Sequence, residues 1–174
     1  MNLLSALAIS IGVLGGVATW AFVGPAAGLG LQIWAAFVAW AAFYHSGGGS
    51  GSLGKNIPAH LFGGLIGLLA LIATTKLAGG LGLPLAAGLS VGIGAAVIVL
   101  AANLPALAQI PSSVYGFGCV AAYALLGGKL ETLTSISLID NPWINVSVSM
   151  VIGALLGAVS EAAGKALAAR PATA

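Results

Sequence analysis

Two histidines and a few acidic or basic side chains are all that this chain offers for acid–base chemistry. His60 is the one ionisable side chain that falls inside a long apolar segment and away from its ends. An ionisable group within lipid is costly, so it is a functional candidate by default. Because Lys55 lies a few residues earlier, a hydrogen-bonded histidine at the membrane interface is an equally good interpretation. His45 ends the preceding apolar segment and is expected at the interface.

The sequence contains none of the residue groups on which enzymes usually depend. It has no pair of carboxylates, no Ser/His/Asp set and no Cys/His cluster with metal-ligand spacing. Glu161 and Lys165 are four residues apart, a spacing at which two charges on a helix pair with each other. We therefore predict no enzyme activity, no catalytic residue, no metal site and no cofactor.

Residues 49–55 resemble the start of a phosphate-binding loop, but the position after Lys55 is Asn56 instead of Ser or Thr. That motif needs a buried strand before it and a soluble helix after it, whereas both neighbours here are apolar membrane segments. We interpret the stretch as a flexible Gly/Ser connector. A second interpretation is that residues 46–54 re-enter the membrane and line a vestibule, which requires shielding from lipid.

Small polar and aromatic side chains inside the apolar segments could line a path for a solute. Hydroxyl groups in membrane helices often bond only their own backbone, and that alternative stays open for each serine. Phe37 and Phe117 are matched by an internal repeat, so we expect them to form a symmetric hydrophobic constriction, with core packing as the alternative. The pathway-lining candidates are Ser10, Ser90, Phe37, Phe117, His60, Asn103, Ser113, Tyr115 and Ser149.

The elements that must position these residues are membrane helices. Of 174 residues, 60% are hydrophobic and only 5% are charged, far from the composition of soluble proteins. The partner this predicts is the lipid bilayer, and a formal net charge of +2 gives no reason to expect nucleic acid. Six apolar segments are expected to be long enough to cross a bilayer, which takes roughly 20 residues. They cover residues 3–23, 28–44, 57–78, 83–102, 111–126 and 143–167. The sequence thus predicts an all-α integral membrane protein with six transmembrane helices.

The first half of the chain recurs in the second half. A shift of 80 positions places Ser10 on Ser90 and Phe37 on Phe117, and it also aligns a Pro-Ala pair and a Gly-Gly pair. Farther on, the register slips by about ten residues. Since each repeat has three helices, the second copy must enter from the opposite side, so we expect two inverted repeats, about 3–78 and about 83–167. Together they form a single membrane domain covering residues 1–174.

Gly-x-x-x-Gly spacings occur on four of the expected helices. Glycines four residues apart share one face and let helices pack closely in lipid. Four such faces exceed what one thin bundle can bury, so we also expect a homo-oligomer. The helix-packing glycines are Gly12, Gly16, Gly63, Gly67, Gly88, Gly92, Gly153 and Gly157.

Two further segments show a family resemblance. Residues 34–44, WAAFVAWAAFY, and residues 110–119, IPSSVYGFGC, make the chain similar to a family of small bacterial inner-membrane proteins catalogued as the domain of unknown function ten-ninety-seven (DUF1097). The resemblance implies a multi-span helical fold in the bacterial inner membrane and assigns no substrate or site. Lys55, Lys165 and Arg170 would face the cytoplasm if both termini lie inside, which is the orientation that we expect.

Symmetry combined with almost no buried charge favours passive transport. Ion-coupled pumps usually need carboxylates or charge pairs within the membrane. We therefore expect a channel or facilitated-diffusion transporter for a small neutral or weakly polar solute, with the pathway between the two repeats. The alternative is a structural or accessory membrane protein that transports nothing and oligomerises through its glycine-rich helix faces.

Overall fold

The computed structural model describes residues 1–169, and this part of the chain is all helical, without a strand. Arg170, which entered the orientation argument, lies outside the described residues. The six α-helices are α1 (Leu3–Val23), α2 (Ile33–His45), α3 (Gly49–Leu81), α4 (Leu83–Ala101), α5 (Ile110–Leu126) and α6 (Pro142–Ala168). Three short 3-10 turns, η1 (Ala27–Leu29), η2 (Pro105–Leu107) and η3 (Leu130–Thr132), lie between them.

Asparagine side chains begin α1 and α6. The Asn2 side chain accepts a hydrogen bond from the Ser5 backbone N–H at 2.8 Å, and the Asn141 side chain accepts one from Ile144 at 3.0 Å. Each bond satisfies an N–H group that has no partner within its helix. In α4, α5 and α6 a proline stands in the first turn, where its missing N–H removes no helical bond.

Four of the helices, α1, α3, α4 and α6, are long and apolar enough to cross a membrane. The expected count of six full-length spans is therefore wrong. With 13 and 17 residues, α2 and α5 are about 20 and about 26 Å long, against roughly 30 Å of hydrocarbon. The second apolar segment gives a shorter helix than expected because Gly30 is left-handed (φ 64°) and Gln32 is extended, which delays the start of α2 to Ile33.

The Gly/Ser-rich stretch is the first part of α3, so its interpretation as a flexible connector was wrong. The Glu161 carboxylate on α6 accepts a hydrogen bond from the Gly49 backbone N–H at 2.8 Å, at the start of the helix. The Ser52 hydroxyl donates to the Gly48 carbonyl at 2.6 Å. The bond to Glu161 satisfies an N–H group that has no partner within α3, which stabilises a helix start that glycine composition alone disfavours.

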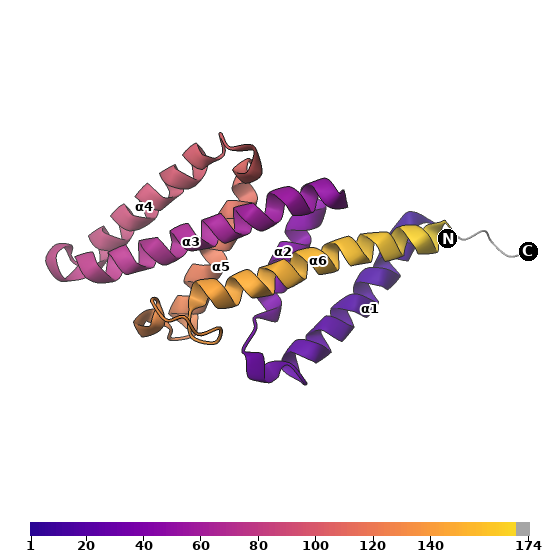
Figure 1. Ribbon diagram of the computed structural model, residues 1–174, viewed down its shortest axis with the longest axis horizontal. Helices are drawn as coiled ribbons and strands as arrows, with labels where there is room; N and C mark the ends of the chain where they lie inside the picture. The colour runs from indigo at the N-terminus through magenta and orange to yellow at the C-terminus, as the bar shows by residue number, and fades with distance from the viewer. Residues whose placement is uncertain (170–174) are drawn as a thin grey trace, which may run out of the picture.

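The long helices α3 and α6 run antiparallel through the centre of the molecule (Figure 1). Helix α3 packs mainly against α4 and α5, whereas α6 packs mainly against α1 and α2. Each central helix therefore packs chiefly against two helices from the other half of the chain. The N-terminus lies near the end of α6 in Figure 1, and Leu7 contacts the backbone at Gly164 there.

The two halves bury matching positions. A shift of 80, from Ser10 to Ser90, relates the buried residues of α1 to those of α4. A shift of 90, from Gly63 to Gly153, does the same for α3 and α6. The register slip of about ten residues expected from the sequence is thus present: the shift is 80 for α1 and α4 and 90 for α3 and α6.

The short helices α2 and α5 follow a third register. Their buried positions coincide at a shift of 77, from Ala36 to Ser113, instead of the expected 80. In this register Phe117 corresponds to Trp40, and Phe37 does not correspond to Phe117. The two phenylalanines matched in the sequence alignment therefore occupy non-equivalent positions, because each helix buries its own small-residue face.

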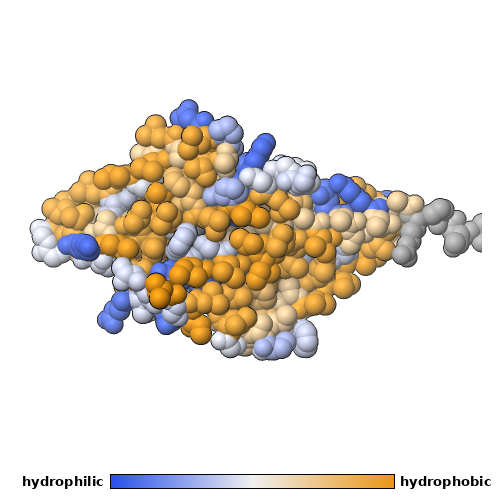
Figure 2. Space-filling view, viewed as in Figure 1, coloured by the Kyte–Doolittle hydropathy of each residue, from blue (hydrophilic) through white to orange (hydrophobic). Residues whose placement is uncertain are grey.

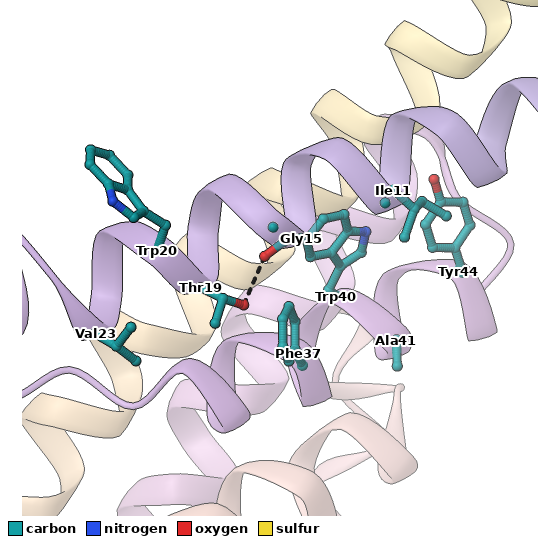
Figure 3. Close-up of a pocket in the computed structure, with 11 residues that line it drawn as sticks. Ile11, Gly15, Thr19, Trp20, Val23, Phe37, Trp40, Ala41 and Tyr44 are labelled. Atoms are coloured by element: carbon teal, nitrogen blue, oxygen red, sulfur yellow. Dashed lines mark hydrogen bonds between the residues drawn. The ribbon is translucent and has the colours of Figure 1, made fainter.

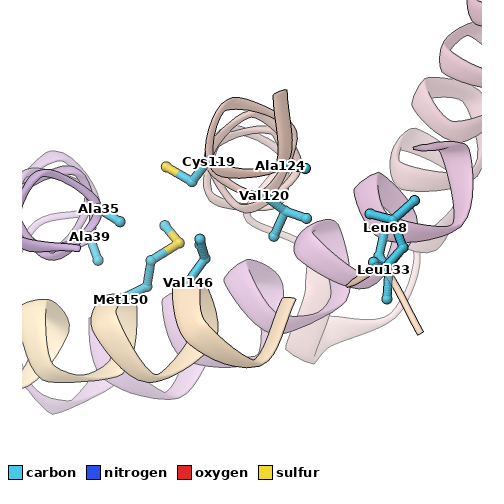
Figure 4. Packing of buried hydrophobic residues seen from close by; sticks show 9 residues of the cluster. All are labelled: Ala35, Ala39, Leu68, Cys119, Val120, Ala124, Leu133, Val146 and Met150. Atoms are coloured by element: carbon cyan, nitrogen blue, oxygen red, sulfur yellow. The ribbon is translucent and has the colours of Figure 1, made fainter. Parts of the chain in front are cut away.

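The buried apolar core lies chiefly where α2, α5 and α6 meet (Figure 4). It consists of Ala35, Ala39, Leu68, Cys119, Val120, Ala124, Leu133, Val146 and Met150. Apolar residues also cover most of the outer face in view in Figure 2. A core of mainly small side chains inside an apolar surface is what helix packing in lipid produces.

Candidate functional site between α3 and α5

Four buried polar side chains lie where α3 crosses α5, and we call them the polar cluster: Asn56, His60, Ser112 and Ser113. The Ser112 hydroxyl donates to the Asn56 side-chain oxygen at 2.6 Å. The His60 Nδ1 lies 2.8 Å from the Ser112 carbonyl oxygen. The cluster therefore combines an amide, an imidazole and two hydroxyls, and it contains no carboxylate or permanent cation.

Two atoms of the polar cluster have no hydrogen-bond partner among the described residues: Nε2 of His60 and Oγ of Ser113. His60 is 3% exposed and Ser113 is 0% exposed. A buried polar atom left unpaired typically costs about 1–3 kcal/mol. Both atoms can therefore form favourable bonds with a small polar molecule that reaches them.

Glycines bring the backbones of α3 and α5 into contact around the polar cluster. A Cβ atom on Gly63 would overlap the backbone carbonyl of Ser113, and one on Gly116 would overlap that of His60. Neither glycine can gain a side chain unless the helices move apart. The crossing is therefore built from backbone surfaces, as small residues allow in membrane proteins.

The corresponding crossing of α2 with α6 has the same geometry and different chemistry. A Cβ atom on Gly153 would overlap the carbonyl of Ala36, just as Gly63 faces the equivalent Ser113 on the other side. The α6 positions equivalent to the two α3 members of the cluster are Val146 and Met150, both buried. At these two positions the first crossing is polar and its counterpart is apolar, whereas farther along α6 the Ser160 hydroxyl is hydrogen-bonded to Trp40 and Tyr44 of α2.

The eight glycines predicted to pack helices fall into two groups. At the glycines of α3 and α6, an added Cβ atom would lie within 3 Å of an atom of another helix: Gly63, Gly67, Gly153 and Gly157. Those of α1 and α4 would meet nothing within 4 Å: Gly12, Gly16, Gly88 and Gly92. The first group packs the chain internally, and the second leaves an open helix face.

The three serine candidates outside the cluster lie at other contacts. The Ser10 hydroxyl donates to the Ser160 carbonyl of α6 at 2.9 Å, so it joins two helices. Ser149 accepts a hydrogen bond from the Gln32 backbone N–H at 2.9 Å and thereby holds the start of α2. The buried hydroxyl of Ser90 has no partner within residues 1–169.

The aromatic and asparagine candidates lie away from the polar cluster. Phe37 is 40% exposed and packs at 6.0 Å, between ring centroids, against Trp40. Phe117 lines two pockets between α5 and the helices α3 and α4. The two phenylalanines line different pockets and do not form the expected constriction in this structure. Asn103 and Tyr115 are exposed, in the turn after α4 and on the outer side of α5.

A groove of about 780 Å³ lies between α1 and α2 (Figure 3). Gly12, Phe37 and Trp40 are among its mainly apolar lining residues. Its Thr19 hydroxyl donates to the Gly15 carbonyl at 2.8 Å, a bond within α1. The groove contains no member of the polar cluster, and its chemistry suits acyl chains or another helix.

Charged side chains pair at the ends of the helices. The predicted Glu161–Lys165 pair is confirmed, at 2.7 Å. A second pair, Lys129 with Asp140 at 2.9 Å, closes the connection between α5 and α6. The hydrogen bond from Lys129 lowers the pKa of Asp140, and the same bond raises the pKa of Lys129.

Within residues 1–169 no three His, Cys, Asp or Glu side chains are grouped to hold a metal ion.

Sequence reasoning missed two buried asparagines. Asn56 holds the polar cluster together, and its spacing of four residues from His60 on one helix was the signal that could have found it. Asn145 donates to the Gly30 carbonyl at 3.0 Å, and its side-chain oxygen has no partner in the described region. Nothing in the sequence pattern distinguishes Asn145 from a lipid-facing polar residue.

Comparison with known families gives one match. Residues 8–165 match the family described as protein of unknown function (DUF1097). The chain belongs to this family. Comparison with curated proteins and with solved structures gives no significant match. The resemblance expected from the sequence is thus confirmed, and it agrees with the apolar helices of a multi-pass membrane protein.

Proposed function

We propose that the protein is a membrane channel or facilitated-diffusion transporter for a small neutral or weakly polar solute. The polar cluster is the observation that carries this proposal. Unpaired polar atoms within a membrane helix bundle are unfavourable, and a passing solute that bonds to His60 or Ser113 removes that cost. Because the cluster contains no charge pair, it offers no obvious means of ion coupling.

The helix arrangement supports a pathway between two inverted halves. Helices α3 and α6 are antiparallel, bury matching positions and each pack against the other half of the chain. Transporters with inverted repeats place their sites between the repeats. The polar cluster has this location, because α3 belongs to the first half and α5 to the second.

Passage requires α3 and α5 to separate around the polar cluster. In the present conformation Gly63 and Gly116 hold the two backbones in contact, so the crossing is closed. Glycine surfaces carry no interlocking side chains, which lets two helices shift without changing many rotamers. This geometry suits a gate that opens by helix movement and admits only small molecules.

A vesicle assay tests the proposal. Stopped-flow volume changes of proteoliposomes are measured with water, urea, glycerol and ammonia. We expect flux of at least one solute above that of protein-free vesicles, reduced severalfold by His60→Met. Methionine occupies the equivalent position in α6, so this replacement suits the local packing.

The matched control is Met150→Leu at the apolar crossing, which should leave the flux unchanged. If none of the four solutes crosses faster than in empty liposomes, the transport proposal is wrong. If the wild-type protein conducts and His60→Met conducts equally well, the pathway lies elsewhere.

A second candidate is an accessory membrane protein that oligomerises or binds a partner helix. The open glycines of α1 and α4 favour it, because a Cβ atom at Gly12 or Gly92 would meet nothing within 4 Å in the chain. Such faces are typical of helix association in lipid. The vesicle assay separates the two candidates, since an accessory protein of this kind carries no solute.

We also propose that the protein resides in the bacterial inner membrane with both termini in the cytoplasm. The family resemblance supports the location. The proximity of the N-terminus to the end of α6 (Figure 1) supports termini on one side. Lys55 and Lys165, at the ends of α3 and α6 nearest these termini, favour the cytoplasmic side under the positive-inside rule.

A further inference from the structure

We propose that Nε2 of His60 is the recognition atom of the site and selects neutral solutes that carry N–H or O–H donors. The inference rests on the transport function proposed for the polar cluster and names the solute class. The chemistry follows from the direction of each hydrogen bond around His60. No carboxylate or cation is hydrogen-bonded to any member of the cluster in the described region.

The proton of the imidazole is fixed on Nδ1. Nδ1 of His60 lies 2.8 Å from the Ser112 carbonyl oxygen, and a carbonyl oxygen can only accept a hydrogen bond. Nδ1 must therefore donate. In the neutral ring the other nitrogen, Nε2, then presents a lone pair and acts as an acceptor.

A chain of hydrogen bonds keeps the acceptor carbonyl in place. The Ser112 hydroxyl donates to Asn56 Oδ1 at 2.6 Å. The Asn56 amide in turn donates to the Ala42 carbonyl at 3.2 Å and to the Ser46 hydroxyl at 2.6 Å. Ser46 donates to the Ala42 carbonyl at 2.8 Å, so the chain ends on α2. Asn56 is thus a positioning residue that fixes the imidazole indirectly through Ser112.

The lone pair of Nε2 is the part of His60 that this chain leaves unused. It is buried and has no partner within residues 1–169. A solute with an N–H or O–H group can satisfy it, whereas a solute with acceptors only leaves it unpaired. With no anion bonded to the cluster, a permanent cation would lack compensation there, so the solute class is neutral donors such as amides, alcohols, ammonia or water.

Nitrogen NMR of the full-length protein in nanodiscs tests this assignment. The chain has two histidines, so His60→Met removes the His60 signals and thereby assigns them. If that variant does not fold, His45→Gln at an exposed position removes the His45 signals, and the remaining signals belong to His60. At alkaline pH we expect the Nδ1-protonated tautomer. Urea and acetone are the probes, because they have the same shape and only urea has N–H donors.

Urea should shift the Nε2 resonance in a saturable manner. Acetone should leave that resonance unchanged. Asn56→Val should release Ser112 and mix the two tautomers, a spectroscopic change that a purely structural role would not produce. No urea shift, an equal shift with acetone, or an Nε2-protonated tautomer would each overturn the assignment. Urea flux in vesicles without an Nε2 shift refutes the recognition role and leaves transport standing. A saturable shift without flux of any solute supports the binding atom and refutes transport.

Discussion

At the scale of single residues, glycine has two different uses in this protein. Gly63 and Gly153 each pack directly against a backbone carbonyl of another helix, so they set how closely the helices cross. Gly12 and Gly92 lie on open faces, where the chain itself supplies no neighbour within 4 Å. The same sequence spacing therefore serves internal packing in α3 and α6 and leaves α1 and α4 accessible.

Alanine substitutions should separate the two uses. Gly63→Ala and Gly153→Ala should each destabilise the protein by about 1–3 kcal/mol or more, because the added methyl group overlaps a backbone carbonyl that cannot move alone. Gly12→Ala and Gly92→Ala, the matched controls, should change stability little or raise it slightly, as alanine favours helix. Thermal unfolding in mild detergent measures the difference. Equal effects at the two kinds of site would show that the α3–α5 and α2–α6 contacts do not govern stability.

At the scale of helices, the sequence predicts which segments are helical better than where they begin. Continuous apolar runs indicated all six helices, because lipid leaves no other means of pairing the backbone. The start of α3 was missed because Glu161, distant in the sequence, accepts a hydrogen bond from Gly49. The length of α2 was overestimated because the conformation of Gly30 is a local backbone property that hydropathy does not reveal.

The connection between α5 and α6 should loosen in acid. The hydrogen bond from Lys129 lowers the pKa of Asp140, so this ion pair stabilises the connection above the ordinary pKa of a carboxyl group. The contribution is lost as the pH falls through the lowered pKa of Asp140. The protection of residues 129–141 from hydrogen exchange, expressed relative to the intrinsic amide rate at each pH, should therefore fall at acidic pH.

The control variant for this pH effect is Asp140→Asn. At neutral pH its residues 129–141 should be less protected from exchange than those of the wild type, and acid should cause no further loss of protection through this ion pair. Identical pH profiles in wild type and variant would remove Asp140 from the stability of the connection.

At the scale of the whole molecule, the two halves share a burial pattern and differ in chemistry. His60 could be singled out from sequence because an ionisable residue in an apolar run is conspicuous. Ser113 was also a candidate, and the spacing of Asn56 from His60 was a usable signal. That these side chains and Ser112 form one site could not be predicted, because they come together only when α3 from one half crosses α5 from the other. The constriction expected from Phe37 and Phe117 failed for a related reason, since similar letters at one offset do not show which helix faces are equivalent.

We expect copies of the chain to assemble through the open faces of α1 and α4. We expect native mass spectrometry from nanodiscs to give a homo-oligomer, because Gly12 and Gly16 expose backbone beside a groove of about 780 Å³ that a helix ridge can enter. Gly12→Ile combined with Gly92→Ile fills both faces with branched side chains and should shift the population toward monomer. Val17→Ile, at an exposed neighbouring position of α1, adds a methyl group on another face and should leave the oligomer intact. A monomeric wild type would refute the assembly, and an oligomer that survives the double substitution would place the interface on other helices.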